Sequence, residues 1–343
     1  MNFTRLVLHK FDPEKTHDLA VGACIAAAKV PFLTDVIESL FGLEDSRLTV
    51  SMGNLNFPNP IGLAAGFDKD GVAVPILQAL GFGFIEVGTV TPKSQPGNEK
   101  PRLFRLRDEN AIINRMGFNN HGIDCLVNSL QKIKKRVPIG INLGKNKQTP
   151  IEHAVDDYLI GLTKAWDCAD YFTINISSPN TENLRDLQQE QNLKPLIETI
   201  IKTRNRLASE SKKYKQIWLK IAPDLSDDDI LQICEIVMNS GIDAMVVSNT
   251  TISRPKPDNP LMNQAGGLSG KPLLNLSNEV LRKVKAATGG KIGLIGVGGI
   301  FEAEDIKAKF DLGADLVQLY TSFVFNGPRF IKKLKLKLVQ ALE

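Results

Sequence analysis

Two asparagines follow apolar, strand-like runs, where an amide side chain needs a polar partner. Asn142 lies in INLGKNK (141–147) and Asn175 lies in TINISSPN (173–180). An unpaired amide that is buried at the end of a strand costs about 1–3 kcal/mol. The two motifs therefore predict that polar groups of the protein or of a ligand meet both side chains.

Nearly every apolar run of the chain ends in a hydrogen-bonding side chain or a glycine. These residues are Ala65, Gly66, Asp68, Lys69, Thr89, Asn142, Asn175, Lys220, Ser248, Asn249, Thr250, Gly298, Gly299, Tyr320 and Thr321. Such a set predicts a large, polar ligand. Lys220 is the most informative, because a lysine at the end of a buried strand costs several kcal/mol unless an anion compensates its charge. The ordinary alternatives are an ion pair with Asp224 and a side chain that reaches solvent.

One glycine motif suggests where an anionic group of the ligand would bind. GVGGI (296–300) can bring backbone N–H groups close to a phosphate. Tyr320 and Thr321 follow the next apolar run. If the apolar runs are the strands of a barrel, these two motifs follow its seventh and eighth strands, whose loops commonly hold a phosphate. The motif is short, so its glycines also suit a simple tight turn.

The elements that must position these residues alternate between short apolar runs and helix-length stretches. The runs are IGLAA at 61, FIEVGT at 84, IGINLG at 139, FTINIS at 172, IWLKIA at 217, AMVVSN at 244, IGLIGVG at 292 and LVQLY at 316. Eight alternations predict an α/β fold, a (β/α)8 TIM barrel, whose active site lies at the C-terminal ends of the strands. A doubly wound sheet is the alternative. A small hairpin is expected at 48–57, and the long connections 89–121 and 250–275 are typical of lids.

Residues 1–45 are predicted to form a small helical arm in front of a barrel domain at 46–343. Asp12 can cap a helix that has Pro13 at its first position, and Gly42 can end a second helix. In the second helix an apolar face is formed by Phe32, Leu33, Val36, Ile37, Leu40 and Phe41. The uncharged run 19–28 would span about 15 Å as a helix, half of the roughly 30 Å of a bilayer core. The segment is therefore expected neither to cross a membrane nor to act as a signal peptide.

Charge and cysteine usage narrow the classes of partner. The chain has 42 basic and 38 acidic residues, net charge +4, which does not suggest a nucleic-acid-binding protein. Four scattered cysteines without a CxxC motif predict neither a disulfide framework nor a metal site. These features fit a small-molecule enzyme in a reducing compartment on the cytoplasmic side. The arm has a net charge of −3, so its apolar faces, rather than charge, would bring it to a membrane.

Several longer motifs resemble dihydroorotate dehydrogenase, and more narrowly its class 2, the quinone-linked, membrane-associated branch. They are LAAGFDKDG (63–71), IEVGTVTPKSQPGNEKPRLFRL (85–106), NRMGFNN (114–120), GINLGKNK (140–147), NISSPNTENLR (175–185), KIAPDLS (220–226), GGLSGKPL (266–273) and GVGGI (296–300). The resemblance covers nearly the whole chain, including the arm. NISSPNT and NRMGFNN are its most specific parts.

The resemblance implies an FMN enzyme that oxidises dihydroorotate to orotate in pyrimidine biosynthesis. In that family hydride leaves C6 for flavin N5 while a base removes a proton from C5. The implied FMN contacts are Ala65, Gly66, Phe67, Asp68, Lys69, Thr89, Asn142, Asn175, Lys220, Ser248, Gly270, Gly299, Tyr320 and Thr321. The implied substrate contacts are Lys69, Asn114, Arg115, Met116, Gly117, Phe118, Asn175, Asn180, Asn249 and Thr250.

The resemblance also implies further roles. Ser178 would be the base, in the place where class 1 enzymes have a cysteine, and would hand its proton onward at a relay site formed with Thr181 and Phe118 beside it; a helix cap before Pro179 is the alternative for Ser178. His17 and Arg105 match positions near a quinone tunnel. His9, His121 and His153 are expected at the surface or as caps. Ser248 and Thr321 replace the family's more frequent threonine and serine but keep the hydroxyl.

The implied partners are dihydroorotate or orotate and a membrane quinone. The protein would associate peripherally with the cytoplasmic face of the inner membrane through the arm. Two other functions fit a barrel with an anion site. One is an FMN enzyme that reduces uridine in tRNA, which needs a basic face and a cysteine acid. The other is a non-catalytic barrel that binds a phosphate compound.

Overall fold

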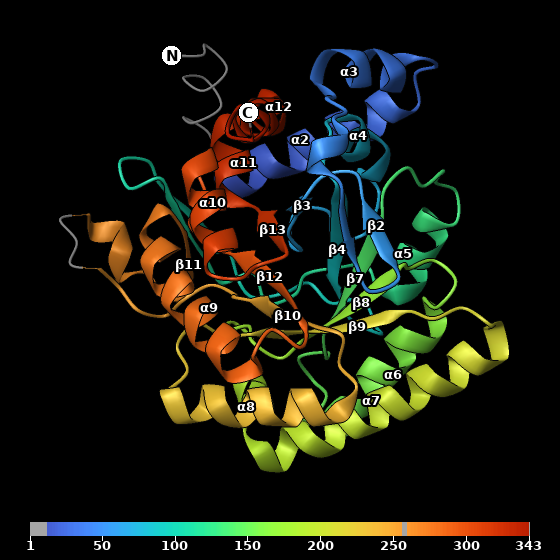
Figure 1. Ribbon diagram of the computed structural model, residues 1–343, viewed down its shortest axis with the longest axis vertical. Coiled ribbons are helices and arrows are strands. Elements are labelled where there is room, and N and C mark those ends of the chain that lie inside the picture. The colour runs from blue at the N-terminus through green and yellow to red at the C-terminus, as the bar shows by residue number, and fades with distance from the viewer. Residues whose placement is uncertain (1–11, 256–258, 343) are drawn as a thin grey trace.

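Eight parallel strands close into a barrel in residues 12–255 and 259–342, which this computed structural model describes (Figure 1). In chain order they are β3 (Ile61–Leu63), β4 (Phe84–Val90), β7 (Ile139–Leu143), β8 (Tyr171–Asn175), β9 (Gln216–Ile221), β10 (Ala244–Val247), β12 (Gly293–Val297) and β13 (Leu316–Leu319). The order around the barrel is β10-β12-β13-β3-β4-β7-β8-β9. Each predicted apolar run supplies one strand, so the barrel prediction is confirmed and a doubly wound sheet is excluded.

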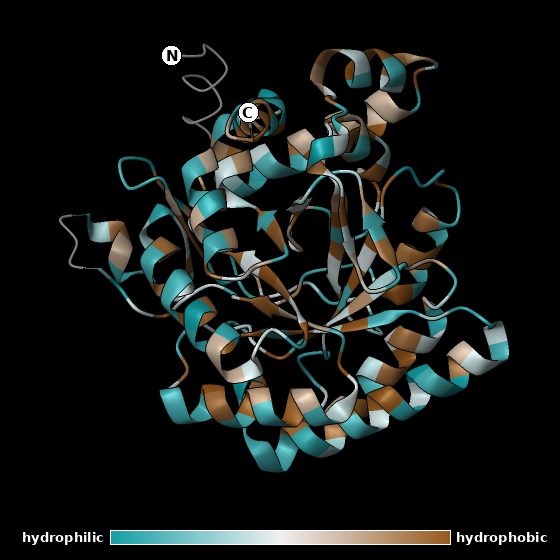
Figure 2. Ribbon diagram, viewed as in Figure 1, coloured by the Kyte–Doolittle hydropathy of each residue, from teal (hydrophilic) through white to brown (hydrophobic). Residues whose placement is uncertain are grey.

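Helices surround the barrel and bury their apolar stripes against its strands (Figures 1 and 2). They are α4 (Val74–Ala79), α5 (Ile123–Leu130), α6 (Ala154–Lys164), α7 (Glu190–Ser211), α8 (Asp227–Ser240), α9 (Leu274–Thr288), α10 (Ala303–Asp311), α11 (Thr321–Asn326) and α12 (Arg329–Gln340). Short 3-10 turns are η1 (Ser46–Leu48), η2 (Ile151–His153), η3 (Leu184–Gln188), η4 (Pro260–Asn263) and η5 (Lys271–Leu273). Local sequence signals explain where several of these helices begin or end. For example, Ser226 and Asp229 form a capping box at the start of α8.

Aromatic side chains fill one end of the barrel. The predicted hairpin, β1 (Val50–Met52) and β2 (Leu55–Phe57), packs there. Phe57 meets Phe84 edge to face, with 5.3 Å between ring centroids, and Trp218 stacks on Tyr171 at 3.6 Å. These rings close the barrel below the strand ends that carry the polar residues.

A polar layer lies above the aromatic layer because alternate residues of a strand point to the same side. Two positions beyond Phe84 is Glu86, which is fully buried, and two positions beyond Trp218 is Lys220. Gln318 from β13 is buried in the same layer and donates to Glu86 Oε2 at 2.9 Å. The interior therefore changes from apolar to polar toward the C-terminal ends of the strands.

The two long connections contribute strands to a second sheet, which differs from the loop-like lids that their composition predicted. The strands β5 (Leu103–Leu106), β6 (Ala111–Asn114) and β11 (Gly267–Gly270) pair antiparallel, with β6 in the middle. In this register Asn114 lies opposite both Leu103 and Gly267. The pairing of distant segments holds Asn114, one of the predicted substrate contacts, in a fixed place.

The arm contains the two predicted helices, α2 (Pro13–Ala28) and α3 (Leu33–Phe41), within its described residues. Asp12 caps α2, accepting a hydrogen bond from Lys15 N at 2.9 Å, and Gly42 follows the end of α3. No single helix in the described ranges is long and apolar enough to cross a membrane; α2 and α3, bent by 116°, meet that criterion only as a pair. His9 and residues 1–11 of the predicted arm lie outside the described residues.

The predicted apolar face of α3 is divided between protein and solvent. Ile37 and Phe41 pack against the core. Phe32, Val36 and Leu40 are exposed, at 80, 49 and 61%. The arm therefore covers the barrel with one part of its apolar surface and leaves another part uncovered.

Candidate active site

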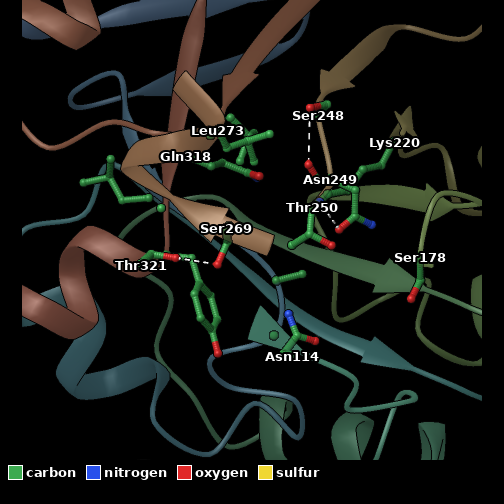
Figure 3. Close-up of a pocket in the computed structure, with 18 of the residues that line it drawn as sticks. Asn114, Ser178, Lys220, Ser248, Asn249, Thr250, Ser269, Leu273, Gln318 and Thr321 are labelled. Carbon is green, nitrogen blue, oxygen red and sulfur yellow. Dashed lines mark hydrogen bonds between the residues drawn. The ribbon is translucent and has the colours of Figure 1, made fainter. Parts of the chain in front are cut away.

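A cavity of about 1060 Å³, counting the space at its mouth, opens at the C-terminal ends of the barrel strands. Most of the predicted contacts line it: Ala65, Gly66, Lys69, Thr89, Asn114, Met116, Gly117, Phe118, Asn175, Ser178, Asn180, Lys220, Ser248, Asn249, Thr250, Gly270, Gly299, Tyr320 and Thr321. In Figure 3, Ser178, Lys220 and Asn249 come from one side of this cavity and Thr321 from the other.

Some predicted contacts do not line the cavity. The carboxylate of Asp68 turns away and accepts hydrogen bonds from the backbone N–H groups of Val72 and Ala73, at 2.9 and 2.7 Å, ahead of α4. Burial raises the pKa of this carboxyl group to about 6. The guanidinium of Arg115 donates to Gln264 Oε1 at 3.0 Å and packs over the ring of Phe104. These two side chains therefore stabilise the walls of the site.

The two asparagines that end β7 and β8 meet in one hydrogen-bonded group. Asn142 Oδ1 accepts from Thr89 Oγ1 at 2.6 Å and from Asn175 Nδ2 at 3.1 Å. Asn142 Nδ2 donates to Glu86 Oε1 at 2.8 Å. Asn142 is thus satisfied by protein groups below the cavity, whereas Asn175 also lines it. The prediction that polar partners meet both amides is confirmed.

The neighbouring serines of NISSPNT have different surroundings. Ser177 is fully buried; its hydroxyl donates to Asn175 Oδ1 at 3.0 Å and accepts from Asn249 Nδ2 at 2.9 Å. Ser178 lines the cavity, and its hydroxyl accepts from the backbone N–H of Asn180 at 3.2 Å. Ser177 therefore orients amide side chains, while Ser178 lies in the wall of the cavity that a ligand would fill.

Two lysines bring positive charge to the cavity. Burial lowers the pKa of Lys220, and the nearby carboxylate of Glu86 opposes that shift. Burial also lowers the pKa of Lys69, against the opposing effect of Asp70 and Glu14. Asp224, the alternative partner considered for Lys220, is engaged by Arg185 at 2.9 Å. The arrangement leaves both ammonium groups available to anionic parts of a ligand.

The geometry around GVGGI suits a phosphate. Gly299 has φ 78°, and a Cβ there would lie 2.3 Å from Leu274 Cα, so only glycine fits. Thr321 Oγ1 donates to Ser269 Oγ at 2.8 Å (Figure 3), and both residues line the cavity together with Gly299. The missing Cβ of Gly299 lets its backbone pack against Leu274, and that backbone and the hydroxyls of Ser269 and Thr321 line the same cavity as a small cradle for a phosphate.

Buried polar atoms without a partner among the described residues provide a test of whether a polar cofactor and substrate fit here. They include Asn180 Oδ1, Thr181 Oγ1 and Gln318 Oε1. Asn180 and Gln318 line the cavity. Buried polar atoms are normally hydrogen-bonded, so the amide oxygens of Asn180 and Gln318 fit a ligand that carries matching donors, whereas Thr181 lies outside the cavity lining. With Lys220 and the glycine cradle, they fit a flavin with a phosphate tail.

Sequence reasoning missed several residues that line or support the cavity. Ser269 and Gln318 line it, and Glu86 supports it from below by accepting from Asn142, Thr173 and Gln318. A glutamate within FIEVGT and a glutamine within LVQLY are polar interruptions of buried strands, and that signal would have identified both. Ser269 had no comparable signal, because its position depends on the pairing of β11 with β6.

Of the two predicted quinone residues, His17 lies in the arm and Arg105 lies in β5. The ring of His17 in α2 packs edge to face on Phe67, at 5.0 Å between centroids. Burial lowers the pKa of His17 to about 4, with Lys69 nearby acting in the same direction. Arg105 in β5 has a buried Nη1 without a partner among the described residues. Phe67 thus lies between the arm and the cavity wall, where Tyr320 meets its ring at 6.5 Å.

The remaining titratable candidates lie elsewhere. His121 and His153 are at the surface beside Asp70 and Asp156, as expected. All four cysteines are free thiols, and none is among the residues that line the cavity. The described ranges contain no group of three or more metal-ligating side chains.

Comparisons with known proteins agree with this geometry. Residues 47–342 match the family model described as dihydroorotate dehydrogenase. Dihydroorotate dehydrogenase (quinone) of Christiangramia forsetii is 49% identical, over 98% of this chain and 97% of that protein, and that of Shewanella halifaxensis is 46% identical, over 95% of each. A crystal structure of DHODH in complex with ferulenol from Eimeria tenella superposes with a TM-score of 0.88 at 36% identity, over 96% of this chain and 92% of that one. The family match and these identities, over nearly the whole chain, establish that the protein belongs to the dihydroorotate dehydrogenase family.

Proposed function

We propose that the protein oxidises dihydroorotate to orotate with bound FMN and passes the electrons to a membrane quinone. The observation that carries the proposal is one cavity whose lining combines Ser178 with the amide side chains of Asn114, Asn175, Asn180 and Asn249 and with the lysines Lys69 and Lys220. The curated relatives from Christiangramia and Shewanella, both named as quinone enzymes, support the choice of acceptor.

FMN would be held between the strand ends and the glycine cradle. Gly299, Thr321 and Ser269 would receive the phosphate, and Lys220 would lie near the negatively charged edge of the ring. Contacts with the rest of the flavin would come from Ala65, Gly66, Thr89, Asn175, Ser248, Gly270 and Tyr320. When bound, FMN supplies an acceptor at N5 for the hydride that leaves C6 of dihydroorotate.

The amide side chains would recognise the pyrimidine ring. Orotate presents alternating donors and acceptors on its imide edge, and an asparagine carries one donor group and one acceptor on a planar amide. Asn114, Asn175, Asn180 and Asn249 reach the cavity from different segments. Lys69 would bind the substrate carboxylate. A buried network of this kind is stable only when its members are satisfied, which favours a ligand with complementary groups.

Ser178 would remove the proton from C5. A serine hydroxyl is a weak base, so its own proton must pass onward as the new bond to hydrogen forms. Thr181 Oγ1 is buried without a partner in the described chain, so it is free to take part in that transfer. Phe118, which lines the same cavity at 9% exposure, would keep bulk water away from the reacting atoms.

The arm would provide the entrance for the quinone and the contact with the membrane. Leu19, Phe32 and Leu40 expose apolar surface at 68, 80 and 61%. Two short helices with such surface can lie in the interfacial plane of a bilayer. His17 and Arg105 would line the path toward the flavin. This arrangement corresponds to peripheral attachment at the cytoplasmic face of the inner membrane.

Flavin release and a steady-state assay test the proposal together. Protein purified as expressed should be yellow and should release about one FMN per chain on denaturation. Dihydroorotate should bleach the flavin, and a quinone should restore its absorption. Folded protein without flavin would point to a non-catalytic phosphate-binding barrel. Flavin that NADPH bleaches and dihydroorotate does not would point to the uridine reductase alternative.

A further inference from the structure

The arm helix α2 carries a buried carboxylate that faces the barrel. Glu14 is 6% exposed; Arg102 donates to it from Nη2 at 2.8 Å and from Nε at 3.2 Å. Lys100, on the solvent side, lies 3.2 Å away. Burial alone would raise the pKa of Glu14, but the hydrogen bonds from Arg102 and Lys100 hold it below its usual value. A buried ion pair often adds little net stability, so stability alone does not account for the burial of Glu14.

The other side of the Arg102 guanidinium holds a turn that belongs to the catalytic domain. Arg102 Nη1 donates to the carbonyl oxygens of Pro96 and Asn98, at 2.6 and 2.7 Å. One planar group therefore joins α2 to the 96–98 turn. Because a guanidinium presents its donors in a rigid fork, a shift of Glu14 must be followed by the turn or must break hydrogen bonds.

Asn98 extends the chain of contacts to both sides of the substrate pocket. Its Nδ2 donates to the carbonyl oxygens of Arg115 and Asn180, at 3.1 and 3.0 Å. Its backbone N–H donates to Met116 O at 3.0 Å. Asn180 Nδ2 in turn donates to Asn114 Oδ1 at 3.2 Å. Segments 114–118 and 178–180 are thus tied to the same turn.

The contact between the turn and the pocket is tightly packed. Gly117 has φ 70°, and a Cβ there would lie 2.7 Å from Asn98 Cγ. The charges of Glu14 and Arg102 also act on Lys69, with opposite effects on its pKa. Neither the hydrogen bonds through Asn98 nor the effect of these charges on Lys69 involves the residues that line the glycine cradle.

We propose that Glu14 and Arg102 are positioning residues for the substrate, through which the packing of α2 against the barrel sets the places of Asn114 and Asn180. The inference rests on the proposed function, because it names dihydroorotate and orotate as the ligands of that pocket. The arm would then affect substrate binding in addition to its proposed role in quinone access. Coupling between two binding sites is reciprocal. A ligand of the arm that strengthens orotate binding by some factor must itself be bound more tightly, by the same factor, when orotate is present.

Binding of orotate to the FMN-loaded protein, followed through the flavin absorption spectrum, tests the proposal. Glu14→Gln keeps the size of the side chain and removes its charge, and should weaken orotate binding roughly 5- to 30-fold. FMN content should not change. The rate of flavin reduction at saturating dihydroorotate should also stay the same, because Ser178 is untouched; a general loss of structure would lower both.

Two variants serve as matched controls. Lys100→Ala removes the exposed partner of Glu14 and leaves Arg102 in place, and Glu38→Gln breaks a different arm ion pair, with Arg136. Both should bind orotate within about twofold of the wild type, as substitutions at exposed sites usually have small effects.

Asn98→Ala interrupts the same route farther along and should weaken orotate binding as Glu14→Gln does. The double variant should bind orotate only slightly more weakly than the single variant with the lower affinity. The effects of two substitutions in one connected set of contacts do not add. Wild-type affinity in Glu14→Gln, or losses that simply add in the double variant, would overturn the inference. If Glu14→Gln does not fold, wild-type affinity in Asn98→Ala overturns it and weakened binding supports it. Failure of the wild type itself to bind orotate would refute the proposed function instead.

Discussion

Ser178→Ala is the most direct test of the proposed chemistry, because the two serines of the motif separate chemistry from binding. Ser178 is 6% exposed, and its hydroxyl takes part in one hydrogen bond to a protein group, from Asn180 N at 3.2 Å. Its removal should cost about 1 kcal/mol of stability. The neighbouring amides keep their hydrogen bonds through Ser177, so the cavity should keep its shape.

The expected loss of rate is much larger than the loss of stability. General-base catalysis is typically worth about 10²- to 10⁴-fold, which corresponds to about 3–5 kcal/mol in the barrier. Stopped-flow mixing of the oxidised protein with saturating dihydroorotate should therefore show flavin reduction slowed by that factor. FMN content and reoxidation of the flavin by quinone should be unchanged.

Ser177→Ala is the matched control. Ser177 joins Asn175 to Asn249 at 3.0 and 2.9 Å, so its loss should raise the dihydroorotate concentration needed for half-maximal reduction more than it lowers the maximal rate. Wild-type flavin reduction in Ser178→Ala would remove Ser178 from the mechanism. Equal losses of maximal rate in both variants would mean that the motif acts by packing.

Three further perturbations have defined outcomes. Lys220→Met removes the cation beside Glu86 and should reduce FMN retention after gel filtration by at least about tenfold, since one lost charged contact is worth roughly 1.5–3 kcal/mol; full flavin content would contradict the role of Lys220. Deletion of residues 1–45 should abolish turnover with a long-chain quinone and weaken liposome binding while saturating dihydroorotate still reduces the flavin; normal quinone turnover and liposome binding would assign the arm to packing alone. The pKa of His17 is about 4 in the folded protein and about 6.5 when unfolded, so the unfolded state binds more protons between these values and stability falls, by up to about 3 kcal/mol, as the pH drops through that window. In His17→Gln the free energy of unfolding, measured by urea denaturation, should fall correspondingly less between pH 7 and pH 4. Equal acid sensitivity of the variant and the wild type would argue against a neutral, half-buried His17.

Local sequence patterns were enough to predict the barrel and the face that carries the site. Each strand is a local apolar run bounded by polar residues or glycine, and the C-terminal ends of parallel strands must share one edge. Asn175, Lys220 and Gly299 could therefore be assigned to one cavity from their positions alone. The caps at Asp12 and Gly42 are equally local, so the arm helices were predictable within the described residues.

The partners of these residues, in contrast, follow from tertiary packing. Glu86 meets Gln318 across 232 positions of sequence, and Glu14 meets Arg102 across 88. No local pattern encodes such pairs, because a side chain's partner depends on how distant segments pack. For the same reason the long connections were expected as lids, whereas they pair as β5, β6 and β11. The division of the apolar face of α3 between core and solvent also follows from packing: α4 and α12 cover one side of that helix, and periodicity shows only that a face is apolar.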